Sequence, residues 1–191
     1  MGERRRGADL EQALLEAAWL ELIEHGYAGL TMERVAEKAG TSRPVISRRW
    51  DGKAALAIAA IRHQMAKHRL EVPDRGNVRT ELLEFLERAS ERAAGIAAAF
   101  TLFTSEYLSE TSSNPEALHL ALIRGEGESL SVILKRGVER GEIDQKKLIP
   151  PVSSLLGDLF RHHAIMNFSA PPPALRKAWV DSVILPLIRA G

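Results

Sequence analysis

The chain has 191 residues, of which 45% are hydrophobic and 27% charged, and it contains no cysteine. This length allows one sizeable core or two small helical units, and the lack of cysteine excludes a disulfide framework and a thiolate zinc site. No apolar run approaches the roughly 20 residues of a membrane span, and Arg4, Arg5 and Arg6 lead into a charged amphipathic stretch that is unlike a signal peptide. We therefore expect a cytoplasmic protein without a membrane partner.

The net charge of +1 is unevenly distributed. Residues 38–53 alone carry a net charge of +4, and the rest of the chain is close to neutral apart from the N-terminal arginines. A local positive surface of this kind indicates that one face meets phosphate.

The first expected helix runs from Asp9 to about His25. Asp9 is a suitable N-cap, and the pattern predicts that Gly26 ends the helix in a left-handed conformation. An apolar stripe at helical spacing gives this helix one buried face, made by Leu10, Leu14, Ala17, Ala18 and Leu22.

Two short helices and a tight turn follow. Thr31 is a good N-cap for a helix over 32–39, Gly40 makes the turn, and the next helix covers about 43–49. Its N-cap is Thr41, Ser42 or Arg43, and Pro44 is tolerated in its first turn. We expect Trp50 to fasten this helix to the core. The pattern is that of a helix-turn-helix, whose second helix enters the DNA major groove.

The rest of the chain is also predicted to be helical. A helix from Lys53 to about Leu70 should bury Leu56, Ala60 and Met65. The segment Pro73–Gly76 then separates a DNA-binding domain, 8–70 with its helix-turn-helix at about 31–50, from a second domain, 77–191. Further helices are expected near 78–94, 95–109, 115–140, 148–168 and 173–189. No stretch alternates with period two, so the expected fold class is all-α.

The N-terminal 65 or so residues resemble the DNA-binding domain of TetR-family (tetracycline-repressor-type) transcriptional regulators. The resemblance rests on many elements in the right order, namely Ala17-Ala18, Gly26-Tyr27, Leu30-Thr31-Met32, Val35-Ala36, Ala39-Gly40, Ser42, Trp50, Lys53 and Leu56. The stretch 134–143 (LKRGVERGEI) is similar to the end of a long core helix in many members.

The resemblance implies an N-terminal three-helix DNA-binding domain, joined by a fourth helix to a C-terminal helical domain for ligand binding and dimerisation. It implies that Thr31 places a helix N-terminus against phosphate, that Arg43 reads a base and that Lys53 meets phosphate. The full set of expected DNA-binding residues is Thr31, Ser42, Arg43, Pro44, Ser47, Arg48, Arg49 and Lys53. Ser47 stands where the family often has tyrosine, and Pro44 where glycine is common.

An enzyme is the first rival class. His162 and His163 are adjacent and point to different sides of a helix, no carboxylate has metal-site spacing around them, and HExxH is absent. Ser153 and Ser154 lack nucleophile-elbow glycines. We therefore expect no catalytic residue, no metal and no cofactor.

A ligand pocket is suggested by Phe100, Phe103 and Tyr107, which share one helix face. From the residues alone, simple core packing is the favoured reading, and the resemblance shifts it toward a site for a small, mostly apolar effector. The remaining candidate wall residues are Met65, Phe85, His119 and Arg124, the last of which could meet one ionic group.

The last two helices have broad apolar faces that are either wrapped inside the domain or packed against a second copy of the chain. The family's dimers favour the second reading. The expected dimer interface is Val152, Leu155, Leu156, Leu159, Phe160, Leu175, Trp179 and Val183.

These observations predict a homodimer that binds a palindromic double-stranded operator, as a repressor released by a small-molecule effector. An activator or a ligand-independent regulator of the same fold is the alternative within this class. A helical protein-binding adaptor is the alternative outside it.

Overall fold

The computed structural model describes residues 7–104 and 126–190, and these form two compact units. Of the described residues, the first unit holds 7–67 and 98–104, and the second holds 68–97 and 126–190. The described residues contain no strand beyond an isolated bridge between Ile143 and Arg189, so the expected all-α class is confirmed.

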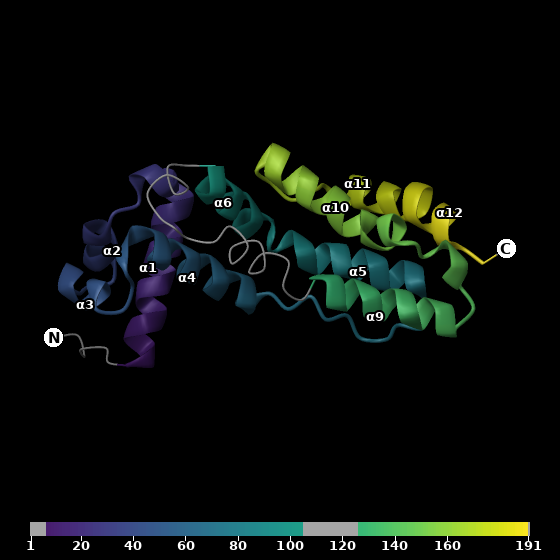
Figure 1. The fold of residues 1–191 in the computed structure, drawn as a ribbon, viewed down its shortest axis with the longest axis horizontal. Coiled ribbons are helices and arrows are strands. Elements are labelled where there is room, and N and C mark those ends of the chain that lie inside the picture. The colour runs from purple at the N-terminus through teal and green to yellow at the C-terminus, as the bar shows by residue number, and fades with distance from the viewer. Residues whose placement is uncertain (1–6, 105–125, 191) are drawn as a thin grey trace. The chain divides into compact units, whose positions relative to one another are not determined.

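The N-terminal unit is built on four helices, which are seen at one end of Figure 1. They are α1 (Ala8–Gly29), α2 (Met32–Lys38), α3 (Arg43–Ser47) and α4 (Gly52–Lys67). Helix α1 packs against α4 and α2, and α3 packs against α2. The expected buried faces are confirmed, because Leu14, Val35 and Leu56 have no exposed surface.

The ends of α1 differ from the expectation. Gly7 is the N-cap residue and Asp9 lies inside the first turn, so the prediction that Asp9 caps the helix is wrong. Gly26 has φ +66° and ψ −178°, a conformation that only glycine adopts readily, and it interrupts the helix before a last turn that ends at Gly29.

Ile46, and not Trp50, fastens α3 to the core. The side chain of Ile46 is fully buried, whereas Trp50 is only half-buried. Among the five residues of α3, Ile46 is the one whose side chain is buried, so it sets which side of this short helix faces the core.

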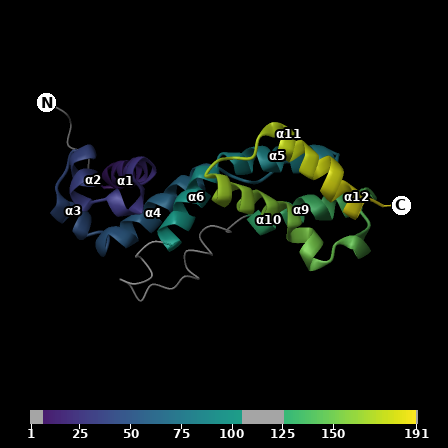
Figure 2. The same cartoon turned by 90° about the horizontal axis from the view of Figure 1, so that it is seen from above.

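The C-terminal unit arranges its helices as a square, in which each side packs against two neighbours. Helix α5 contacts α9 and the last helix, and α10 contacts the same two partners (Figures 1 and 2). The bounds are α5 (Val78–Ser90), α6 (Ala93–Thr104), α9 (Glu126–Glu139), the 3₁₀ turn η1 (Gln145–Lys147), α10 (Pro150–Asn167), and the continuous last helix formed by α11 (Pro173–Ala178), the π-helical segment η2 (Trp179–Ile184) and α12 (Leu185–Ile188). The start of α6 belongs to this unit, and its residues from Ala98 onward belong to the N-terminal one.

The end of α9 is held against α5 by a close approach at Gly137. A Cβ placed there would lie 2.5 Å from Cδ1 of Ile143 and 3.3 Å from Cγ2 of Val78. Gly141 then ends the helix with φ +73°, and the amide of Glu142 donates to the carbonyl of Gly137 over 2.9 Å. The sequence RGVERGEI therefore has glycine at two positions for different reasons, namely close packing at Gly137 and a positive φ at Gly141.

Charged side chains reinforce the same contact. Glu81 of α5 is fully buried and lies 3.1 Å from Nη1 of Arg140. Arg140 also donates from Nε to Glu142 over 2.6 Å, and the carboxylate of Glu142 accepts from the backbone amide of Val78 over 2.9 Å. The N-terminus of α5 is thus capped by a residue that follows α9.

Candidate nucleic-acid interface

The turn between α2 and α3 has the hydrogen bonds of a Schellman motif. The amide of Thr41 donates to the carbonyl of Ala36 over 2.9 Å, and the amide of Gly40 donates to Glu37 over 3.0 Å. Gly40 has φ +66°, which a side chain disfavours. This motif fixes the direction in which the chain enters α3, as a helix-turn-helix requires.

The N-termini of the two short helices are set by different means. The hydroxyl of Thr31 accepts from the amide of Arg34 over 3.3 Å, so Thr31 is the expected N-cap of α2. Ser42 is the N-cap residue of α3 by its extended backbone, which resolves the choice among Thr41, Ser42 and Arg43, although its side chain makes no capping bond. Pro44 lies in the first turn of α3, where no helical hydrogen bond is lost.

Three cations lie on or directly after α3. Arg43 and Arg48 are exposed, and Arg49 donates from Nη1 to the carbonyl of Val45 over 3.0 Å. Nη1 of Arg43 is 3.0 Å from the carboxylate of Glu33, in the first turn of α2, and both side chains are more than half exposed. The structure brings these arginines together on the exposed side of α3, because Ile46 holds its other side to the core.

Lys53, at the start of α4, is placed by an aromatic ring. Its Nζ lies 4.2 Å from the centroid of the Tyr27 ring, and the Tyr27 side chain is buried. A cation over the face of an aromatic ring gains electrostatic stabilisation, and this contact holds the amino group of Lys53 in place. Tyr27 and Lys53, two residues of the sequence pattern, are thus in direct contact, and sequence reasoning did not assign this contact.

A buried carboxylate joins α1 to α2 and was missed by sequence reasoning. Glu21 is 3% exposed and lies 2.8 Å from Nζ of Lys38 and 3.0 Å from Nε of Arg34. The hydrogen bond from Lys38 and the charge of Arg34 hold the pKa of Glu21 below its ordinary value, against the effect of burial. The signal in the sequence is a glutamate beside Leu22 on the apolar stripe of α1. Because Lys38 is neutralised here, the positive surface is made mainly by α3 and Lys53.

Glu21 also belongs to a group of three side chains whose ligand atoms lie close enough together to hold a metal ion. Ligand atoms of Glu21, Glu24 and His25 lie within 4.8 Å of one another. Arg34 and Lys38 already occupy the Glu21 oxygens, so the group serves as an ion-pair cluster between α1 and α2.

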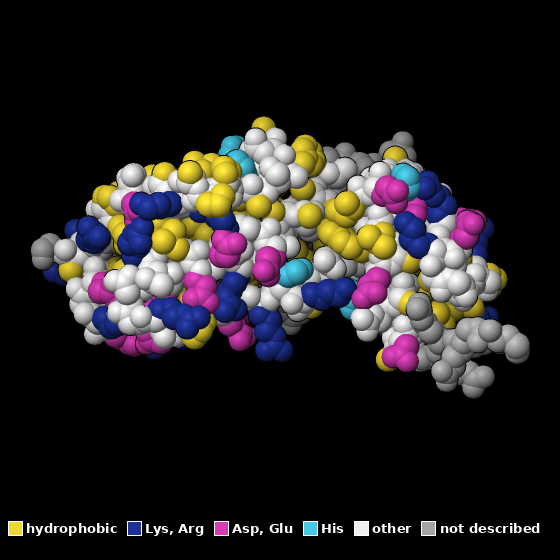
Figure 3. All heavy atoms as spheres, turned by 180° about the vertical axis from the view of Figure 1, so that it is seen from behind, with side chains coloured by type: hydrophobic (Ala, Val, Ile, Leu, Met, Phe, Trp, Pro, Cys, Tyr) yellow, Lys and Arg dark blue, Asp and Glu magenta, His cyan; other side chains and the backbone are white. Residues whose placement is uncertain are grey.

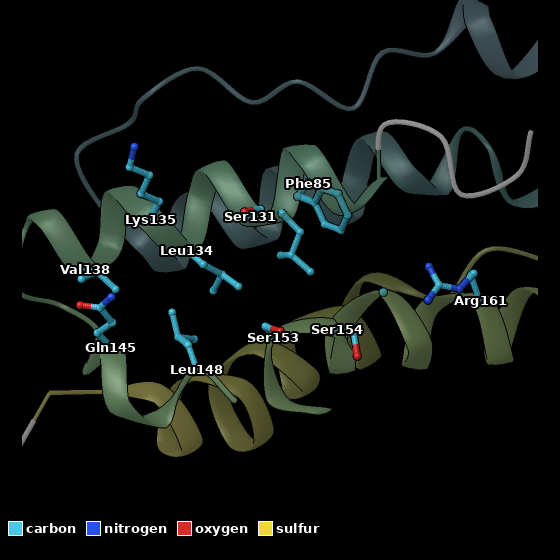
Figure 4. A pocket seen from close by; sticks show the side chains of 12 residues that line it. Phe85, Ser131, Leu134, Lys135, Val138, Gln145, Leu148, Ser153, Ser154 and Arg161 are labelled. Atoms are coloured by element: carbon cyan, nitrogen blue, oxygen red, sulfur yellow. The ribbon is translucent and has the colours of Figure 1, made fainter. Parts of the chain in front are cut away.

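The expected effector-pocket residues are only partly within the described structure. Met65 and Phe85 are buried in separate units, and Phe100 is 37% exposed on α6. The side chain of Phe103 and residues Tyr107, His119 and Arg124 lie outside what the structure describes. A cavity of about 620 Å³ does lie in the C-terminal unit, between α9 and α10, and Phe85 is among its walls (Figure 4).

The expected dimer-interface residues fall into two groups. Leu156 and Phe160 are buried within the C-terminal unit, and so they belong to its own core. The others are half-buried on α10 and the last helix, namely Val152, Leu155, Leu159, Leu175, Trp179 and Val183. Figure 3 shows hydrophobic side chains gathered over the C-terminal helices.

The described part of the chain has no helix long and apolar enough to span a bilayer.

Two family models cover most of the chain. Residues 14–60 match the model described as bacterial regulatory proteins, tetR family, and residues 72–183 match the tetracyclin repressor-like C-terminal domain. The chain belongs to the TetR family of transcriptional regulators. TetR-family regulators are helix-turn-helix DNA-binding proteins and not enzymes, which confirms the expected class. The domain bounds of 8–70 and 77–191, and the individual DNA-binding residues, stay predictions.

Similar proteins span nearly the whole of this TetR-family chain. A DNA-binding transcriptional repressor TetR of Mycobacteroides abscessus is 31% identical over 97% of both chains. An uncharacterised HTH-type transcriptional regulator of Mycobacterium tuberculosis is 30% identical over 92% of this chain and 86% of its own. Among solved structures, a TetR transcriptional regulator from Chloroflexus aurantiacus shares the fold with a TM-score of 0.67, at 18% identity over 98% of this chain and 100% of its own.

Proposed function

We propose that this regulator represses transcription by binding a palindromic operator as a homodimer, and that a small, mostly apolar effector releases it. The observation that carries DNA recognition is the exposed side of α3, which presents Arg43 and Arg48 while Ile46 anchors the helix. A helix of this kind reads base edges, and the flanking cations meet phosphates. The relative from Mycobacteroides abscessus, which is named a repressor, supports repression over activation.

The dimer supplies the second recognition helix. Val152, Leu155 and Leu159 follow one another at helical spacing on α10, and Trp179 of the last helix contacts His163 edge-to-face with ring centroids 6.0 Å apart. Further apolar side chains on these helices are exposed to water, namely Met166 at 64% and Leu187 at 44%, and exposed apolar patches on soluble proteins mark interaction sites. We therefore assign this surface to a second copy of the chain.

Effector release follows from linkage. Two recognition helices must lie roughly 34–36 Å apart, or at a related spacing, to enter successive major grooves. An effector that binds better when this spacing is lost must lower the affinity for the operator. An activator, or a regulator without an effector, would use the same DNA surface.

The test is selection of genomic fragments from the source organism by the purified full-length protein, followed by sequencing. We expect enrichment of an inverted repeat whose half-sites are about one helical turn apart. The matched control is the double variant Arg43→Ala/Arg48→Ala, which should enrich nothing. Equal enrichment by the control, or no enriched motif with the wild-type protein, would contradict the assignment of α3.

A reporter gene placed behind the enriched fragment separates the two signs of regulation. Repression predicts lower expression when the regulator is present, and higher expression predicts the activator alternative.

A further inference from the structure

The cavity of the C-terminal unit is a groove between α9 and α10, with α5 behind it (Figure 4). It has a volume of about 620 Å³, within the range of small-molecule sites. Among the described residues that line it there are two cations and no carboxylate; the walls are Phe85, Leu130, Ser131, Leu134, Lys135, Val138, Gln145, Leu148, Ser153, Ser154, Gly157 and Arg161. The groove therefore has an uneven chemistry, with apolar side chains on α5 and α9, and serines and Arg161 on α10.

The apolar walls come from α5, α9 and Leu148, whereas α10 lines the groove with Ser153, Ser154, Gly157 and Arg161. Phe85 of α5 is 1% exposed, and Leu130 and Leu134 of α9 are each 6% exposed. These side chains are fixed by their own packing, so the surface that they offer to a ligand is already formed. An apolar body placed against them loses contact with water at little cost in side-chain ordering.

Arg161 supplies the charge at one end of the groove. Its guanidinium lies over Gly157, where an added Cβ would be 3.3 Å from Nη1. Figure 4 shows the guanidinium turned back along α10 toward the groove, whereas the amino group of Lys135 points away from it. Asp158 pairs with the other terminal nitrogen of Arg161, outside the lining. The missing side chain at Gly157 thus gives the guanidinium its place at the cavity wall.

We propose that this groove binds a small amphipathic anion, with its apolar body against Phe85, Leu130 and Leu134 and its carboxylate at Arg161. A guanidinium forks toward a carboxylate with several N–H donors and can serve more than one acceptor. A cationic ligand would meet two cations, Lys135 and Arg161, and no carboxylate among the described lining residues. The inference deepens the proposed effector control, and it rests on that function only for its consequence at DNA.

The test compares three probes that share one tail: octanoate, 1-octanol and octylammonium. Binding to the full-length protein is measured by titration calorimetry, with thermal unfolding as a second readout. We expect octanoate to bind about tenfold more tightly than 1-octanol, and octylammonium to bind most weakly. Failure of octanoate to bind, or equal affinity for the three probes, would overturn the proposal.

Two variants locate the site. Arg161→Gln should reduce octanoate affinity to the level of 1-octanol and leave 1-octanol affinity within about threefold, because the apolar walls are unchanged. Lys135→Gln is the matched control, since it removes a lining charge that points away from the groove, and it should keep the preference for octanoate. A preference that survives Arg161→Gln would refute the role of Arg161.

Gly157→Leu tests the groove itself. The three atoms nearest to a Cβ at this position all belong to the flexible guanidinium of Arg161, and Gly157 lines the cavity, so a larger residue here extends into the groove. The variant should lose both octanoate and 1-octanol while its melting temperature stays near the wild-type value. Retained binding of either probe would place the ligand elsewhere.

DNA binding is measured separately, so the two proposals can fail independently. If the protein binds its operator but does not bind octanoate, the anion site is overturned and the DNA-binding assignment stands. Octanoate binding that leaves operator affinity unaltered would support the site and contradict effector release. Loss of the motif in the selection experiment would refute the DNA-binding assignment and leave the calorimetry valid.

Discussion

The arginine at the start of the recognition helix differs from the lysine that follows it in how it is held. Arg43 is more than half exposed and pairs with Glu33 of α2, whereas Lys53 is directed by the ring of Tyr27. A forked guanidinium suits base readout, and an ammonium at a helix start suits a phosphate. These two residues should therefore contribute to different parts of the binding free energy.

Arg43→Ala should weaken specific operator binding by about 1–3 kcal/mol and affect unrelated DNA much less. Lys53→Ala should weaken binding to all sequences and reduce the salt slope by about one unit. Both are measured by titrating labelled operator and unrelated DNA over a range of salt concentrations. If both variants bound the operator as well as the wild type, α3 would not be the recognition helix.

Glu33 should restrain binding to unrelated DNA. Its carboxylate competes for Arg43 and adds a negative charge beside the DNA-facing surface. Glu33→Gln should therefore raise nonspecific affinity by about 0.2–1 kcal/mol, the range of an exposed ion pair, and lower the ratio of specific to nonspecific affinity. Glu37→Gln, an exposed position on the same helix, is the control for the loss of one charge. Equal effects of the two substitutions would show that the pair with Arg43 is irrelevant.

At the scale of elements, a cluster of ion pairs ties α5 to the segment that precedes it. Glu84 of α5 accepts from Nε of Arg75 over 2.8 Å and from Nη2 of Arg88 over 2.8 Å. The hydrogen bonds from Arg75 and then Arg88 lower the pKa of Glu84 from the usual 4.5 to about 2. The segment before α5 is thereby tied to that helix.

The ion pairs of Glu84 predict that the free energy of unfolding falls in acid. Because the pKa of Glu84 is depressed in the folded state, its contribution is complete above pH 4.5 and is lost as the pH falls toward 2. Between about pH 7 and pH 3 the wild type should lose about 2 kcal/mol more unfolding free energy than Glu84→Gln does. Urea unfolding followed by circular dichroism measures both values. Glu128→Gln, an exposed carboxylate of α9, should keep the wild-type loss, and identical acid losses for all three proteins would remove Glu84 from this role.

At the scale of the whole molecule, the proposed dimer decides whether one recognition helix or two meet the DNA. Leu159→Glu should disrupt the dimer, because it places a charge in the apolar surface of α10, and operator affinity should fall with it although the DNA-facing residues are unchanged. Sedimentation and operator titration at matched concentrations measure the two effects. Ala174→Glu adds the same charge at an exposed position of the last helix that is outside the assigned interface, and it should leave both unchanged. A monomeric wild type at micromolar concentration would contradict the assigned interface.

The sequence by itself determined the helical class and the helix-turn-helix. These follow from local causes, namely apolar residues at helical spacing, the cap at Thr31 and the turn at Gly40, each of which acts within a few residues. The same local reasoning misplaced the cap at Asp9 and expected Trp50 to fasten α3, whereas Ile46 is the buried residue, because burial in a five-residue helix depends on which side meets the rest of the unit. The local sequence pattern is sufficient to predict structure only where the residues in contact are also close in the chain.

Only the tertiary structure decided the features that join distant segments. Glu21 meets Arg34 and Lys38, Glu81 meets Arg140, and the groove takes its walls from α5, α9 and α10, which are far apart in the chain. Sequence spacing gives no distance between helices that pack side by side, so a buried charge or a cavity wall is not visible until the helices are assembled. The physical reason is that these sites are made by packing, whereas the helix-turn-helix is made largely by the backbone and its caps.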